Sequence, residues 1–321
     1  MTDIFYRKSN YNQFDNLYVD VNKLYEEFPI TDKINGKSGI PSFARTKFHK
    51  IYRSSLLPLR RRTALCEFLR RVNVDLSWFQ EFSSYWTRVL HGRPMWGVQD
   101  FYFLRGLYSV KFSANQVPDT DDPGTQLSAW QRPEIIYQLF HQVYKEAIRS
   151  EIATLELLFK YKKDVSRFLE FGCANAPITT SLFDFFPSAR SFNIYISDIK
   201  TLAFHYGGYR FRNCSNVHPI LLSPENGFLP VSPEPVDAIF CMAVFEHLNQ
   251  PLNVVKAFYE MLEHGGILIF DYIRGEGAGL DTKQGVLQRE HVLDYVSHKF
   301  NILFGSLEKD ESMGITVVQK K

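Results

Sequence analysis

The sequence predicts an α/β fold with a largely parallel β-sheet, preceded by a mainly helical N-terminal domain. Two observations support this prediction. From Val165 to the end of the chain, short apolar runs alternate with helical patterns, which is typical of βαβ units. Before about residue 125 this alternation is absent, and the chain is rich in Tyr, Phe and Trp. We therefore divide the chain into an N-terminal domain, residues 1–125, and an α/β domain, residues 126–321.

Composition limits the kind of protein that this chain can be. Its 321 residues, 45% of them hydrophobic, can fill the cores of about two domains. The 37 Lys and Arg residues nearly balance the 35 Asp and Glu residues, so the net charge indicates no polyanionic partner. The first residues contain no apolar signal core, and no apolar run reaches the roughly 20 residues of a membrane span. We expect a soluble, cytoplasmic protein without a membrane partner.

Four cysteines are scattered along the chain: Cys66, Cys173, Cys214 and Cys241. They follow neither a C-x-x-C pattern nor a Cys/His spacing that would ligate zinc. Isolated cysteines of this kind are typical of reduced thiols in a cytosolic protein. We therefore predict no metal site.

The clearest element of the N-terminal domain is helical and runs from about Leu59 to Val89. Apolar side chains recur there at three- and four-residue steps, with a break where Asp75 is the expected N-cap of a second helix. The aromatic stretch 96–107 is expected to fill a core rather than to line a substrate mouth. Five arginines form either a solvated helix face, which we favour, or a nucleic-acid patch: Arg60, Arg61, Arg62, Arg70 and Arg71.

A polar linker with two prolines is predicted over residues 113–124, and a long helix should follow it. Pro133 suits the first turn of that helix, and one apolar stripe continues over residues 136–161. Three ring side chains of this region either face a pocket or pack in a core: Trp130, Tyr137 and His141.

The stretch from Val165 to Pro187 organises the C-terminal domain. It contains an apolar strand up to Phe171, a turn of small residues, and a helix that stops at Pro187. A parallel strand is continuously apolar because both its faces are covered, yet Glu170 interrupts the run beside the turn. A carboxylate there is costly unless something binds it. Ligands of open α/β sheets lie at this edge, beyond the carboxyl ends of the strands.

Residues 170–176, EFGCANA, resemble motif I of the class I S-adenosylmethionine-dependent methyltransferases, usually an acid-x-Gly-x-Gly-x-Gly. Here Ala174 and Ala176 replace the second and third glycines. One methyl group at each position is tolerated if φ stays negative, with a slightly looser approach of the backbone to the cofactor. The turn lacks the G-x-G-x-x-G pattern that a dinucleotide pyrophosphate requires.

The next two predicted strands also end in polar residues. Residues 192–196 form a strand that ends at Ser197-Asp198. The resemblance implies that Asp198 binds the ribose hydroxyls, and the alternative is a plain N-cap for the following helix. Residues 217–222 form the third strand. The family often places an Asp against the adenine at this point, where this chain has Ser223-Pro224-Glu225.

A second run of residues supports the resemblance. Residues 236–248, VDAIFCMAVFEHL, precede Pro251, a helix to Leu262, and Gly265-Gly266, which we expect to turn the chain with positive φ into a strand at 267–270. The family shows a similar acid, Glu-His, Pro and Gly-Gly run, with Pro where this chain has His264. The resemblance covers about residues 130–321.

The end of the chain agrees with the same family. Residues 289–296 form an amphipathic helix, and residues 300–304 and 315–318 form a hairpin. In this family a reversed last strand closes the sheet. The resemblance therefore implies a Rossmann-like, seven-stranded, mostly parallel sheet with helices on both faces, and an N-terminal helical cap over the catalytic domain.

The resemblance further implies a site for S-adenosyl-L-methionine. The residues that we expect to bind this cofactor are Glu170, Gly172, Ala174, Asn175, Asp198, Ile199, Ser223 and Met242. His247 and Asp271 follow the fourth and fifth strands, and either could accept a proton from the acceptor. For His247, holding the loop or the methionine end of the cofactor is an equally supported role. Tyr272 is a candidate for the acceptor pocket.

We therefore predict methyl transfer to a small organic acceptor, such as a natural-product intermediate, a sugar or a modified peptide, with oxygen preferred over nitrogen as the accepting atom. Two alternatives stay open. One is a catalytically silent, methyltransferase-like binding subunit, and the other is an RNA methyltransferase that uses the arginine cluster. A nucleic-acid partner is not expected, and a homodimer is the candidate assembly.

Overall fold

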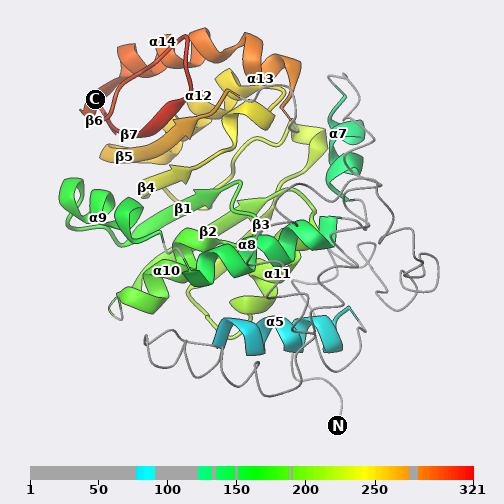
Figure 1. Ribbon diagram of the computed structural model, residues 1–321. Coiled ribbons are helices and arrows are strands. Elements are labelled where there is room, and N and C mark those ends of the chain that lie inside the picture. Colours follow the sequence, from blue (N-terminus) through cyan, green and yellow to red (C-terminus); the bar gives the residue numbers. More distant parts are fainter. Residues whose placement is uncertain are drawn as a thin grey trace, which may run out of the picture. The chain divides into compact units, whose positions relative to one another are not determined.

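The computed structural model of the chain describes residues 77–90, 122–131, 135–148, 151–186, 188, 191–274 and 281–321 (Figure 1). The chain divides into two compact units. The first comprises Met1–Leu17, Gln116–Arg132 and Arg149–Lys321, and the second comprises Tyr18–Asn115 and Pro133–Ile148. This division differs from a single boundary after residue 125, because the segment Pro133–Ile148 belongs with N-terminal residues.

A seven-stranded sheet with the order β3-β2-β1-β4-β5-β7-β6 forms the centre of the first unit. Strands β1 to β5 are parallel, whereas β7 runs antiparallel to both β5 and β6. The strands are β1 (Arg167–Phe171), β2 (Asn193–Asp198), β3 (Val217–Leu221), β4 (Val236–Cys241), β5 (Leu262–Tyr272), β6 (Phe300–Phe304) and β7 (Met313–Lys320). The predicted seven-stranded, mostly parallel sheet with a reversed last strand is confirmed.

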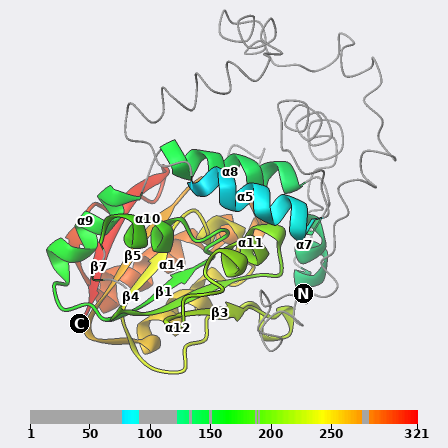
Figure 2. The same ribbon diagram turned by 90° about the horizontal axis from the view of Figure 1, so that it is seen from below.

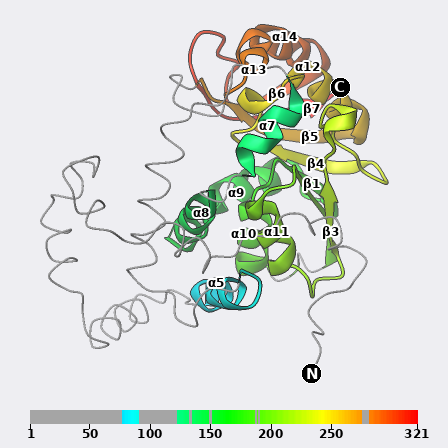
Figure 3. The ribbon, with the colours of Figure 1, turned by 90° about the vertical axis from the view of Figure 1, so that its right-hand side faces the viewer.

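Helices cover both faces of this sheet. Figures 1 and 2 show α9 (Ile152–Tyr161), α10 (Pro177–Phe185) and α11 (Leu202–Arg210) on one face. Figure 3 shows α12 (Pro251–Met261) and α14 (Arg289–Lys299) on the other face. Each group of helices packs on its own cluster of buried apolar side chains. This arrangement confirms the predicted Rossmann-like architecture.

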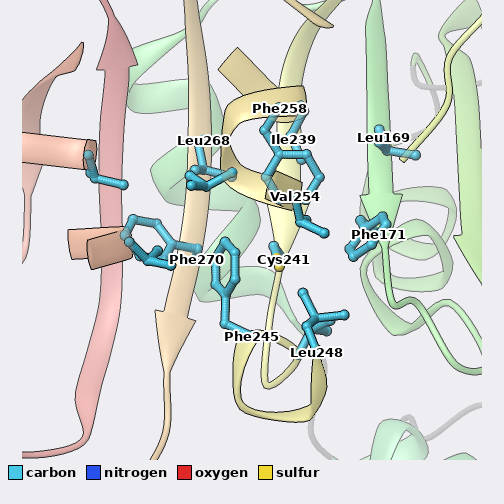
Figure 4. Close-up of a cluster of buried hydrophobic side chains, with 14 of the residues drawn as sticks. Leu169, Phe171, Ile239, Cys241, Phe245, Leu248, Val254, Phe258, Leu268 and Phe270 are labelled. Carbon is cyan, nitrogen blue, oxygen red and sulfur yellow. The ribbon is translucent and has the colours of Figure 1, made fainter. Parts of the chain in front are cut away.

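The central strands are largely apolar because successive side chains point into opposite clusters. In β4, Ile239 and Cys241 join the cluster under α12 and α14, whereas Ala238 and Phe240 join the cluster under α9 and α10. Figure 4 shows the first of these clusters, with Phe258 of α12 among its members. Burial of each large apolar side chain contributes about 1.5–3 kcal/mol to folding.

Strand β5 begins earlier than the sequence predicts. The Gly265-Gly266 pair lies inside the strand, at an irregularity in its pairing with β4, rather than in a turn before it. Only Gly265 has a positive φ, of 72°. The strand also continues through Asp271 to Tyr272, so Asp271 is a strand residue rather than the residue just beyond the strand.

The region before β1 differs from the prediction in two ways. The predicted linker ends before Pro123, because helix α7 (Pro123–Trp130) begins there and the Asp122 carboxylate caps it by accepting a hydrogen bond of 2.8 Å from Thr125 N. The predicted long helix is two helices, α8 (Ile136–Ile148) in the second unit and α9 in the first. The amide of Glu151 donates a 2.9 Å hydrogen bond to Ser181 Oγ and so fixes the start of α9 on α10.

In the second unit, α5 (Ser77–Arg88) packs against α8. The rings of Phe82 and Phe140 meet edge to face with centroids 5.3 Å apart, and both side chains are buried. Helix α5 confirms the last part of the predicted helical stretch. The earlier part of that stretch, which includes Asp75, lies outside the described residues. The arginine cluster and residues 96–107 also lie outside them. Tyr137 and His141 stack on each other along α8, with centroids 6.1 Å apart.

Among the helices of the described residues, none combines the length and the apolar character that a membrane span requires.

Candidate active site

The carboxyl ends of β1, β2, β4 and β5 meet at one edge of the sheet. Their registers pair Phe171 with Ser197 and with Cys241, and Cys241 with Phe270. The residues that follow these positions, or end these strands, include most of the predicted site. The predicted cofactor and catalytic residues are therefore neighbours in space, as the parallel topology requires.

Glu170 is bound by the helix that follows it. Its side chain is 2% exposed, and its carboxylate accepts hydrogen bonds from Ile178 N (3.0 Å), Thr179 N (2.9 Å) and Thr179 Oγ1 (2.6 Å). These amides belong to the first turn of α10, where helical N–H groups lack partners within the helix and favour a negative charge. Glu170 thus fixes α10 to β1 behind the turn. Its direct contact with the cofactor stays a prediction.

The turn after β1 has a left-handed backbone at three positions. Gly172 has a φ of 64°, Ala174 of 48° and Ala176 of 58°. The condition under which the two alanines would be tolerated without strain, a negative φ, is therefore not met. A left-handed conformation costs an L-residue about 1–2 kcal/mol and persists only where surrounding contacts fix it. Here the amide of Cys173 donates to Ser197 O (3.1 Å), and the amide of Ala176 donates to Cys173 O (2.7 Å).

Gly172 is required at the first of these positions for a steric reason as well. A Cβ atom built on Gly172 would lie 2.4 Å from Val244 Cγ2. Val244 follows β4, so this contact brings the turn after β4 directly against the turn after β1. Asn175 is 2% exposed and lies in the same turn. Its backbone carbonyl accepts a 3.1 Å hydrogen bond from Arg210 Nη1 of α11.

Asp198 has the geometry of a ligand for a diol. Oδ2 accepts a 2.6 Å hydrogen bond from Ala174 N, and Oδ1 accepts one of 2.6 Å from Ile199 N. A carboxylate has about four acceptor sites, so each oxygen keeps one site for a further donor. Burial raises the pKa of Asp198 to about 6, although both backbone bonds act in the opposite direction. Two adjacent acceptors of this kind are what a pair of neighbouring hydroxyls needs, and the contact of Asp198 with the ribose of S-adenosylmethionine stays a prediction.

The alternative role of Asp198 as a helix N-cap is excluded by the structure. The N-cap of α11 is Thr201, whose hydroxyl accepts a 3.1 Å hydrogen bond from Phe204 N. After β3, Ser223 is itself a cap, since its hydroxyl accepts a 3.2 Å hydrogen bond from Glu225 N of the 3₁₀ turn η5 (Pro224–Asn226). Adenine contacts by Ser223, Ile199 and Met242 stay predictions.

Asp271 stabilises the turn after β4. Its Oδ1 accepts a 2.5 Å hydrogen bond from the amide of Ala243, a residue with a φ of 53°. Burial raises the pKa of Asp271 above its ordinary value, and the bond from Ala243 lowers it. The geometry gives Asp271 a clear role in holding this turn. Proton abstraction by Asp271 is not required to explain its position.

Glu246 is a residue that the sequence analysis missed. It lies in the 3₁₀ turn η6 (Phe245–His247), is 3% exposed, and has no hydrogen-bond partner for Oε2 among the described residues. Burial raises the pKa of Glu246 to about 8, and the charges of Asp271 and Asp281 act in the same direction. Glu246 is therefore largely protonated at neutral pH. The Glu-His pair in the sequence was the available signal, but only its histidine was considered.

His247 lies among acidic and aromatic side chains. Its Nδ1 is 3.3 Å from Asp281 Oδ1, and its Nε2 is 4.0 Å from Glu246 Oε1. The ring of Trp130 meets the imidazole edge to face, with centroids 5.6 Å apart. The next residue, Gln131, donates from Nε2 to Lys200 O at 2.9 Å, just after β2. Thus α7 and the residue that follows it contact the loops after two strands, which the sequence analysis did not anticipate.

Tyr272 does not line an acceptor pocket, contrary to the expectation. It is 1% exposed, its hydroxyl donates to Gly285 O, and its ring stacks on Phe245 with centroids 5.3 Å apart. The Tyr272 ring belongs to the cluster of buried apolar side chains under α12 and α14, so it lies in the core and not at the surface of a pocket. The guanidinium of Arg289 covers the ring at 4.7 Å.

The comparison with protein-family models decides the family. A model described as a methyltransferase domain matches residues 139–299, half of the chain. The chain belongs to the methyltransferase domain family. Together with the seven-stranded sheet, this makes it an S-adenosylmethionine-dependent methyltransferase. The cofactor supplies an activated methyl group, and the residues at the strand ends would hold it. Among curated proteins, none matches this chain.

Solved structures with a similar fold include several methyltransferases. The N-methyltransferase NodS from Bradyrhizobium japonicum WM9, in complex with S-adenosyl-L-homocysteine, is 18% identical, with 53% of this chain and 86% of that chain covered and a TM-score of 0.39. The StiE O-methyltransferase domain is 12% identical, with 53% and 74% covered and a TM-score of 0.40. A putative rRNA methylase from Clostridium thermocellum is 15% identical, with 54% and 98% covered and a TM-score of 0.40. Likeness at this level says nothing of the acceptor of this methyltransferase.

Proposed function

We propose that this methyltransferase transfers the methyl group to a hydroxyl or amino group of a small organic acceptor, with oxygen preferred. The arrangement around His247 carries the proposal. A histidine between Asp281 and Glu246, in contact with the Trp130 ring, can accept a proton beside an aromatic surface. A base is needed where the accepting atom must lose a proton, and histidine has a suitable ordinary pKa. The near-neutral net charge favours a small acceptor over a polyanion.

Roles follow for the other residues of the edge. Asp198 would bind the ribose hydroxyls through its two remaining acceptor sites. Gly172, Ala174 and Asn175 would form the turn against the cofactor, and Asp271 would hold the turn that carries His247. A catalytic role of His247 needs Nε2 to be available to the acceptor, because Nδ1 is buried beside Asp281.

The test is methyl transfer from radiolabelled S-adenosylmethionine to a panel of small phenols, sugars and amines. We expect His247→Ala to lower kcat at least about 100-fold, the range of a lost general base, while the affinity for the cofactor stays unchanged. His264→Ala is the matched control, because His264 is exposed on β5. A His247→Ala variant with full kcat would remove the role as base, and loss of cofactor binding would assign His247 to the cofactor site.

No observation on the described residues favours an RNA methyltransferase, and the only feature that would fit a silent binding subunit there is the replacement of two motif glycines by Ala174 and Ala176. The arginine cluster on which RNA binding would depend lies outside the described residues. The geometry of Asp198 supports cofactor binding, which a silent subunit would not need. The expectations of a homodimer and of no nucleic-acid partner remain predictions.

A further inference from the structure

A segment after β5 is fastened to the turn that carries His247. The amide of Thr282 donates a 2.9 Å hydrogen bond to Glu246 O, and its hydroxyl donates one of 2.7 Å to Leu248 O. The same hydroxyl accepts a 2.8 Å bond from Gly285 N and caps the short helix α13 (Lys283–Leu287). Thr282 is 7% exposed, so these bonds are shielded from water. Residues 282–285 are therefore attached to η6 through backbone and side-chain hydrogen bonds.

Gly285 makes this close attachment possible. A Cβ atom at this position would lie 2.2 Å from Glu246 O, which no side chain could tolerate. On its other side, the carbonyl of Gly285 accepts the hydrogen bond from the Tyr272 hydroxyl. The segment is thus fixed between η6 and the end of β5. This packing determines where the residue before Thr282 can lie.

That residue is Asp281, and its carboxylate reaches the buried nitrogen of His247. Oδ1 of Asp281 lies 3.3 Å from Nδ1, and the exposed fractions of the two side chains are 13% for Asp281 and 26% for His247. Glu246 Oε1 lies 4.0 Å from Nε2 on the other side of the ring. Of these two acidic side chains, Asp281 lies nearer to the imidazole, and burial raises the pKa of Glu246 to about 8 and so favours its neutral form.

We propose that Asp281 is a positioning residue for His247. Its carboxylate lies within ion-pair distance of Nδ1, and its negative charge favours the tautomer that carries the proton on Nδ1 and leaves Nε2 unprotonated. The proton of the acceptor hydroxyl or amine then passes to Nε2, while Nδ1 keeps its own proton beside the Asp281 carboxylate. The resulting imidazolium carries one positive charge next to one carboxylate. This inference rests on the proposed function of His247 as the base.

Nitrogen-15 NMR of the histidine rings tests this inference on the full chain without any ligand. In the wild type at neutral pH, we expect Nδ1 of His247 to be protonated and Nε2 to be unprotonated. In Asp281→Asn, we expect a mixture of tautomers and a titration midpoint of His247 that is about one pH unit lower, because the neighbouring negative charge that favours imidazolium is lost. Asp294→Asn is the matched control. It removes the same charge from an exposed ion pair with Lys309 and should leave His247 unchanged.

An unchanged tautomer and midpoint in Asp281→Asn would overturn the inference. If that variant does not fold, the wild type still decides, because a ring protonated on Nε2 instead of Nδ1 contradicts the inference directly. Calorimetry with S-adenosylmethionine on the same samples separates this result from the proposed function. Absence of cofactor binding by the wild type would remove the proposed function, whereas the NMR spectrum alone reports on Asp281.

Discussion

The turns after β1 and β4 are built in the same way and are used differently. In each, an alanine with positive φ donates its amide to an aspartate at the end of the neighbouring strand: Ala174 to Asp198 of β2 at 2.6 Å, and Ala243 to Asp271 of β5 at 2.5 Å. Such a bond between strands can hold a left-handed alanine in place despite its cost.

The two turns differ in how the buried glutamate beside each of them is hydrogen-bonded. Glu170 accepts three hydrogen bonds from α10, whereas Glu246 is equally buried but leaves Oε2 without a partner among the described residues. The buried charge of Glu170 behind the turn after β1 is thus compensated by hydrogen-bond donors of α10, which would suit a rigid cofactor site. The turn after β4 keeps a neutral acid beside His247, as suits a site where protons move.

The largest expected effect that separates the two regions is on stability. Glu170→Gln replaces an acceptor oxygen by an NH₂ group that faces donors of α10, so we expect a loss of about 2–3 kcal/mol in the free energy of unfolding. Glu246→Gln should change the free energy by less than about 1 kcal/mol at pH 6, because the native acid is already neutral there. Urea denaturation of both variants measures the two changes, and equal losses would contradict the comparison.

The pH dependence of the free energy of unfolding gives a second test of the neutral state of Glu246. The folded pKa of Glu246, about 8, lies above its ordinary value of 4.5, so the folded state keeps a proton that the unfolded state has lost. This stabilising contribution is complete below pH 4.5 and disappears as the pH rises through 8. Between pH 6 and pH 9 the wild type should lose about 2–3 kcal/mol more than Glu246→Gln does. Parallel pH profiles for the two proteins would show that Glu246 is ionised in the fold.

The smallest expected effect concerns the two alanines. Ala174→Gly and Ala243→Gly remove the steric cost of positive φ and add some entropy to the unfolded chain, so each should stabilise the fold by about 0.5–1 kcal/mol. Thermal denaturation measures this change, with Ala203→Gly in α11 as a control that should destabilise the fold. Destabilisation at Ala174 or Ala243 would mean that the methyl group makes contacts that outweigh its strain.

The sequence predicted the sheet well because its signals are local. Continuous apolar runs marked the strands, and Asp198 was proposed because the family resemblance implies an acid at the end of the second strand, where Asp198 lies. The sign of φ at Ala174 was not predictable, since it depends on a hydrogen bond to Asp198 in another strand. Asp281 and Glu246 were missed for the same reason. Their importance comes from a segment fastened by Thr282 and Gly285, residues that carry no signal of their own.

Calorimetric titration with S-adenosylmethionine and S-adenosylhomocysteine, on the wild type and on Asp198→Ala, tests the central claim most directly. We predict micromolar binding of both ligands by the wild type, roughly −8 kcal/mol, and its loss in the variant, because the two acceptor sites for the ribose hydroxyls disappear. Asp294→Asn should bind as the wild type does. Equal affinity of Asp198→Ala and the wild type would contradict the assignment of Asp198, and no binding by the wild type would contradict the cofactor site as a whole.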